Sequence, residues 1–225
     1  MNSEIRTTKK IIATAICILL TVIFACGCSS EAKEKKIAEK TLHEKYGAEF
    51  QCDIVRDYDS KSFYAWCRSG DARFKALVGK KKSYGCLDNY VPAKIAAHMA
   101  EDVSVKLKSM GYDYYVIAEN SMEFITEDNT EMSVREYLEK HPGDRFGIYI
   151  MVPEDDVEEF RRDGLLDAVR THVAQTFSEK YCYVSAFWGN EEQIEQIRFG
   201  IEDEYRKTDS FDLELQDVLW YNEIK

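Results

Sequence analysis

The chain has 225 residues, with 41 acidic side chains against 30 basic ones and a formal net charge of −11. Hydrophobic residues make up 45% of it and aromatic residues 12%, which is typical of a folded globular body. Because duplex nucleic acid and anionic lipid surfaces are bound by clustered Lys and Arg, the acidic balance argues against a nucleic-acid partner and against a polybasic grip on lipid.

The first 25 residues have the layout of a secretory signal. Residues 1–10 are polar and net positive, and residues 11–25 are apolar and uncharged. A run of 15 residues is shorter than the roughly 17 to 25 that a membrane-spanning helix needs. We therefore expect a signal peptide over residues 1–25, and the alternative is a retained signal anchor. Either interpretation places the body outside the cytoplasmic membrane.

Two cysteines follow the apolar run. Ile23-Phe24-Ala25-Cys26 resembles the lipobox of bacterial lipoprotein precursors, with an aliphatic residue three positions before the cysteine and a small residue directly before it. The resemblance implies that Cys26 receives a diacylglyceryl group, whose acyl chains are of the palmitate type, and becomes the first residue after cleavage. Cys28 is the alternative. The implied protein is lipid-anchored at the extracytoplasmic face of the cell membrane, with residues 26–36 as a charged tether.

Cys52 and Cys67 are a candidate disulfide pair in this extracytoplasmic setting. Apolar residues alternate on both sides of a polar turn at residues 58–61, a pattern typical of a β-hairpin. A hairpin centred on Asp59-Ser60 puts Cys52 opposite Cys67, within disulfide reach. A slip of one residue in register would break this alignment, so the alternative is two buried thiols.

The first half of the body is expected to form one unit over residues 37–118. A charged helix over 31–46 ends at Gly47, and a second helix runs from Pro92 to Gly111 with an apolar stripe at helical spacing. Between them, period-two alternation predicts an antiparallel meander and then a basic loop at 80–82. The three predicted strands are 50–57, 62–68 and 72–78.

The second half, residues 119–225, alternates strands and helices. Ser133 and Glu136 form a capping box for a short helix, and acidic residues after Pro153 open another that breaks at Asp163-Gly164. Strands are expected at 112–118, 121–125, 145–152 and 181–188, a short helix after Asn190, and a last strand in FDLELQDVLW at 211–220. The order predicts an α+β fold: a helix–antiparallel meander–helix unit, then a split β-α-β-like unit that shares a core with the first or forms its own.

Aromatic side chains give the main candidate for a binding surface. Tyr64 and Trp66 alternate with the inward-facing residues of their strand, so they point to the outer face of the meander. An exposed patch there favours a protein or glycan partner. The alternative is that the second flanking helix covers this face. Further aromatic residues that we considered for the same patch are Tyr84, Tyr90, Tyr112 and Trp188.

Motifs for catalysis are missing from the sequence. It has no CxxC, GxSxG, P-loop, GxGxxG or HExxH, and the four histidines lack metal-site spacing, so we expect no catalytic residue, metal or cofactor. The body resembles small, uncharacterised Gram-positive lipoproteins in KYG-x-EF, at Lys45–Phe50, and DNY, at Asp88–Tyr90, which implies no particular activity. We expect a non-enzymatic binding module; the alternatives are an envelope enzyme acting on wall polymer or peptide, and a structural envelope component.

Overall fold

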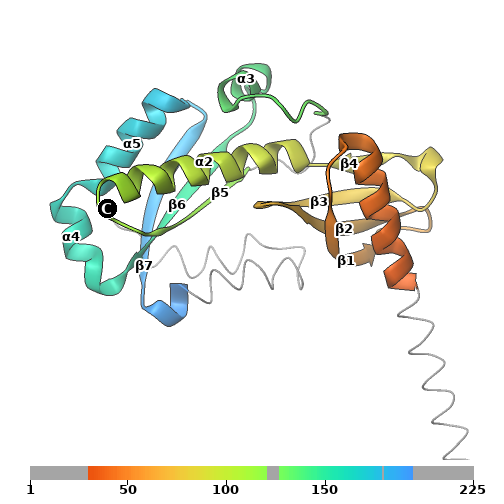
Figure 1. The fold of residues 1–225 in the computed structure, drawn as a ribbon, viewed down its shortest axis with the longest axis horizontal. Coiled ribbons are helices and arrows are strands. Elements are labelled where there is room, and N and C mark those ends of the chain that lie inside the picture. Colours follow the sequence, from red (N-terminus) through yellow and green to blue (C-terminus); the bar gives the residue numbers. More distant parts are fainter. Residues whose placement is uncertain (1–29, 121–126, 179, 195–225) are drawn as a thin grey trace, which may run out of the picture.

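The computed structural model describes residues 30–120, 127–178 and 180–194. They form a mixed α+β fold, which confirms the predicted fold class: a helix, a four-stranded antiparallel meander, a long helix, and a three-stranded sheet with further helices (Figure 1). Several predicted features lie outside the described residues. These are the signal peptide with Cys26 and Cys28, the strand at 121–125, the end of the helix after Asn190, and the strand at 211–220.

The meander forms as the alternation predicts. Its order is β1-β2-β3-β4, with each neighbouring pair antiparallel, and Cys52 lies opposite Cys67. The two cysteines are joined by a disulfide with a Cα–Cα distance of 4.0 Å. The structure thus has the disulfide rather than the alternative of two buried thiols. The strands are β1 (Gln51–Asp57), β2 (Ser62–Ser69), β3 (Ala72–Gly79) and β4 (Cys86–Asp88).

A bulge in β1 changes which side chains face outward. The register shifts between Cys52 and Ile54, so that Ile54 pairs with Trp66 and Val55 with Ala65. An uninterrupted period-two alternation through Phe50, Cys52 and Ile54 would place Ile54 on the same face as Cys52. The extra residue in the bulge instead turns Ile54 to the outer face and Val55 toward the core, because one inserted residue reverses a period-two alternation.

Both helices next to the meander pack on its inner face. Ala38 and Leu42 of the N-terminal helix (residues 30–46) are fully buried against the inward side chains of β2 and β3. Tyr90, the first residue of α2 (Tyr90–Ser109), joins the same cluster. Sequence analysis gave as an alternative that the second flanking helix covers the outer face. In the described part of the chain, neither of these two helices does so.

Helix α2 connects the two halves of the body (Figure 1). Ile95, Met99, Val103 and Leu107 of the predicted stripe are buried, while Met110 is half-buried just after the helix. Gly111 follows with a φ of 97°, a left-handed conformation that glycine adopts without strain. The stripe packs against the second sheet, so α2 is a core element rather than a ligand groove.

The second sheet has the order β5-β6-β7. Strands β5 and β6 are antiparallel, whereas β6 and β7 are parallel and directly hydrogen-bonded, so no strand separates them as in a split β-α-β unit. Its strands are β5 (Tyr115–Asn120), β6 (Phe146–Pro153) and β7 (Cys182–Gly189). Its helices are α3 (Val134–Lys140), α4 (Val157–Arg162) and α5 (Leu165–Thr176), and α3 carries the predicted capping box.

Candidate interaction surface

The outer face of the meander brings aromatic and basic side chains together in rows. Across the strands, Arg56 pairs with Tyr64, and Tyr64 with Leu77. In the next row Trp66 pairs with Lys75. A third row pairs Arg68 with Arg73, so this face carries four cations although the chain as a whole is acidic. We call these residues, together with Ile54 and Tyr58, the outer meander face.

Two of the four cations of this face, Arg56 and Lys75, lie against its aromatic rings. Lys75 Nζ is 4.0 Å from the centroid of the Tyr64 ring and 5.2 Å from that of Trp66. The Arg56 guanidinium carbon lies 5.6 Å from the Trp66 ring. Cation–π contacts at this range contribute about 0.5 to 2 kcal/mol each, depending on desolvation. The contacts hold the long basic side chains close to the sheet. Because these side chains are already ordered, they lose less rotamer entropy when a partner binds.

Exposure varies strongly over the face. Tyr58 is 58% exposed and its ring contacts that of Tyr64 edge-on, with the centroids 5.1 Å apart. Tyr64 is half-buried, whereas Trp66 is only 6% exposed. The structure therefore places both predicted residues on the outer face, but Trp66 lies beneath its neighbours and Tyr58 is the more accessible ring.

The other aromatic residues that we considered do not join this surface as a group. Tyr90 is buried in the inner core of the meander, and Tyr112 stacks on Tyr114 in the other half of the body. Trp188 packs against the core of the second sheet. Tyr84 is exposed beside Lys61, in a short 3₁₀ helix, Lys82–Tyr84, that begins at the last residue of the predicted basic loop.

Sequence reasoning missed the basic side chains as part of this site. Arg73 and Lys75 alternate with buried Phe74 and Ala76, so the period-two pattern already places them beside Trp66. Arg56 and Ile54 could not be placed in the same way, because the β1 bulge sets their direction and the alternation gives no sign of it.

A second group of charges lies at the junction of the two halves. Asp88 of β4 is buried and accepts hydrogen bonds from Lys45 Nζ at 3.0 Å and Tyr46 Oη at 2.6 Å. Lys45 Nζ also lies 3.0 Å from Asp128 Oδ1. Burial lowers the pKa of Lys45, but Asp88 and Asp128 outweigh it, so the net shift is upward and the ammonium stays charged. This network ties the N-terminal helix to both halves, so its buried charges are explained by a role in holding the fold together.

Glu127 is the second buried carboxylate at the junction. Its Oε1 accepts the backbone N–H groups of Asp128 and Asn129, and its Oε2 lies 2.6 Å from Lys140 Nζ and 2.9 Å from His141 Nε2. Burial raises the pKa of Glu127, but Lys140, the Asn129 N–H and His141 together bring the pKa down to about 2. Every contact stabilises the carboxylate, so Glu127 is a fixed anion and not a proton donor at neutral pH.

The remaining reactive groups show no catalytic arrangement in the described part of the chain. His172 Nε2 lies 2.5 Å from Asp102 Oδ2 and so links α5 to α2. Burial, with Asp88 nearby, raises the pKa of the Cys86 thiol to about 12, and burial raises that of Cys182 to about 11. Such thiols are protonated and poorly nucleophilic. Within the described ranges, no group of three His, Cys, Asp or Glu side chains is placed to hold a metal ion.

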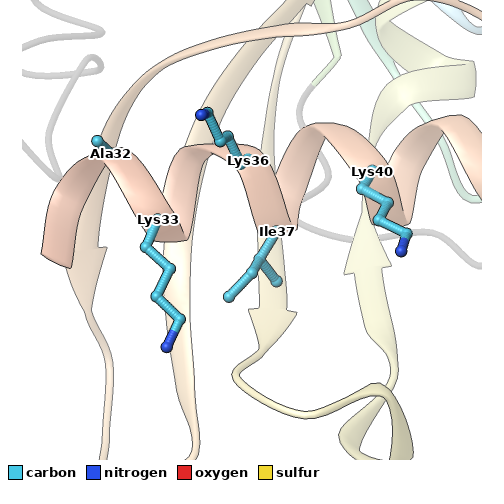
Figure 2. Close-up of a pocket in the computed structure, with 5 residues that line it drawn as sticks. All are labelled: Ala32, Lys33, Lys36, Ile37 and Lys40. Atoms are coloured by element: carbon cyan, nitrogen blue, oxygen red, sulfur yellow. The ribbon is translucent and has the colours of Figure 1, made fainter. Parts of the chain in front are cut away.

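One hollow lies along the N-terminal helix. It is lined by Lys33, Lys36 and Lys40 together with Ala32 and Ile37 (Figure 2). All five residues come from this one helix, and the lysine side chains extend away from it in different directions. The hollow therefore lacks the converging polar groups of a small-molecule site.

Comparison with known proteins found no match: no family model matches the chain, and neither a curated protein nor a solved structure is significantly similar to it. Among residues 30–120, 127–178 and 180–194, no helix combines the length and the apolar character that a membrane crossing requires.

Proposed function

We propose that this chain is the precursor of a lipid-anchored extracytoplasmic lipoprotein whose body is a non-enzymatic binding module. The lipobox-like Ile23-Phe24-Ala25-Cys26 supports the anchor, with Cys26 acylated and Cys28 as the alternative. The Cys52–Cys67 disulfide is consistent with an oxidising compartment, because such bonds persist mainly outside the cytoplasm.

The observation that carries the binding role is the outer meander face. Tyr, Trp and Arg are the residues most enriched at the energetic centres of protein interfaces, and this face combines them within two neighbouring rows. Arg68 is paired with Asp53 at 3.6 Å, but the four cations outnumber this carboxylate and give the face the opposite sign to the chain as a whole. Electrostatic complementarity then favours an acidic protein segment as the partner. The expected partners are thus membrane lipid, through the diacylglyceryl anchor, and an acidic envelope protein.

Site-specific photo-crosslinking in intact cells tests this role. A photoreactive residue at Tyr58, on the outer meander face, should give a discrete crosslinked protein. The same residue at Val105, which is equally exposed on α2, should not.

Charge reversal supplies the control for this experiment. The double substitution Arg56→Glu and Lys75→Glu should abolish the Tyr58 crosslink, because it places carboxylates against an acidic partner. Lys33→Glu with Lys36→Glu, on the N-terminal helix, is the matched control and should leave the crosslink intact. Equal loss in both double variants, or equal crosslinking from Tyr58 and Val105, would refute the outer meander face as the binding surface.

A further inference from the structure

The three-stranded sheet has two different faces. One face packs Val116, Ile148 and Ile150 against α2, α4 and α5 in the main core. The opposite face carries the alternate side chains, and we call it the helix-free face because helices α2, α3, α4 and α5 all bury their side chains in the main core. Of the described helical segments, only the turn at 191–194 reaches it, through Ile194. The side chains on this face form a separate small cluster of Tyr115, Ile117, Tyr149, Met151, Phe187 and Ile194. Among the described residues, Ile194 is the only member that does not come from a strand.

Side chains at the centre of the helix-free face are buried all the same. Met151 is 2% exposed and Phe187 is 9% exposed. In register, Met151 lies between Tyr115 on β5 and Phe187 on β7. Neighbours on adjacent strands flank a side chain that stands upright on a sheet, but they leave its far end open. Trp66 on the meander is buried beneath the long side chains of Arg56 and Lys75. Among the described residues, the cluster around Met151 and Phe187 contains no such basic side chain. The burial of Met151 and Phe187 therefore indicates a second layer over the face.

The chain itself supplies material for this layer at the right place. Ile194 already packs on the cluster, and the 31 residues from 195 to 225 follow directly from it. An extended chain spans about 3.3 Å per residue, whereas neighbouring strands are only about 4.8 Å apart, so this length can cross three strands several times. The segment also contains Phe211, Leu213 and Leu215 at alternate positions, which put three apolar side chains on one side of an extended run.

We propose that residues 195–225 cover the helix-free face and bury Met151 and Phe187 as the second layer of the sheet. The surface is thus an intramolecular docking site whose partner is the C-terminal segment of the same chain. The helix-free face is distinct from the outer meander face, so this proposal stands or falls independently of the proposed function.

Methionine oxidation in the full-length protein gives the first test. Peroxide oxidation followed by mass spectrometry reports the accessibility of Met151, with fully buried Met99 in the main core as the internal reference. Replacing Phe211, Leu213 and Leu215 together by Ser should raise the oxidation rate of Met151 several-fold and leave Met99 slow. Replacing Asp212, Glu214 and Gln216 by Ser is the matched control and should change neither rate.

Crosslinking gives a second test that leaves the sequence of residues 195–225 unaltered. A photoreactive residue at Tyr183, a partly exposed position on β7, should crosslink within its own chain to a peptide from 195–225. Crosslinks to a second copy, or protection of Met151 that falls on dilution, would overturn the proposal in favour of a dimer. Slow oxidation of Met151 in the apolar triple variant would overturn it as well.

Discussion

Glu127 illustrates how hydrogen bonds and ion pairs compensate the burial of a charged side chain in this fold. Its side chain is 5% exposed, yet both carboxylate oxygens have partners from three directions: the following backbone, Lys140 and His141. Removing an ion from water costs several kcal/mol, so a buried carboxylate persists only with such complete compensation. The same reasoning applies to Asp88, which Lys45 and Tyr46 hold at the junction.

The lowered pKa of Glu127 predicts a specific acid sensitivity. Its folded pKa of about 2 lies below the reference value of 4.5, so its contribution to stability is complete above the reference value and is lost as the pH falls toward 2. Glu127→Gln should lower the free energy of unfolding at pH 7 by about 2 kcal/mol and flatten its decline in acid.

Urea unfolding measured at a series of pH values checks this prediction, with Glu131→Gln as the control because the Glu131 side chain is largely exposed. A Glu127→Gln variant whose acid dependence matches that of the unaltered protein would contradict the assignment of the lowered pKa to this residue.

At the scale of elements, the sequence predicted the features that have strong local signals. The Ser133–Glu136 capping box starts α3, and Gly111 follows α2, because these positions have particular hydrogen-bonding or backbone requirements. The β1 bulge and the three-residue strand β4 escaped prediction. A bulge interrupts the alternation that reveals a strand, and β4 depends on pairing with β3 rather than on a pattern of its own.

For the candidate site, the sequence predicted which way the aromatic side chains point but not how deeply they are buried. Alternation in β2 placed Tyr64 and Trp66 on the outer face, as the structure has them. The burial of Trp66 beside Arg56 and Lys75 could not be predicted, because it depends on which residues of β1 and β3 come alongside. Cross-strand neighbours follow from register, and a single inserted residue changes the register.

The junction between α4 and α5 gives an element-scale prediction. Gly164 has a φ of +61° there, in the left-handed region where a side chain costs about 1 kcal/mol. Gly164→Ala should therefore lower the free energy of unfolding by roughly that amount in a denaturant titration. Gly143→Ala is the matched control, since Gly143 has open space and no left-handed φ. Equal stability of the two variants would contradict the strain argument.

At the scale of the whole molecule, the two large hydrophobic cores of the described chain are connected by shared elements, apart from the small cluster on the helix-free face. Helix α2 contributes Tyr90 to the meander core and its long stripe to the core of the second sheet. Tyr46 packs against both cores and donates to Asp88 and to the carbonyl oxygen of Glu127. These shared contacts join the halves into one body, which the proposed anchor would hold at the membrane through the N-terminal helix.

The anchor is the central claim, because both the compartment and the binding role depend on it. The most direct measurement is the intact mass of the membrane-extracted protein, with thiols alkylated under denaturing conditions before and after reduction. We predict a chain that begins at Cys26 and carries diacylglycerol, with Cys28, Cys86 and Cys182 alkylated before reduction and Cys52 and Cys67 only afterwards. Cleavage before Cys28 would select the alternative cysteine, whereas a full-length, unacylated mass would contradict the account.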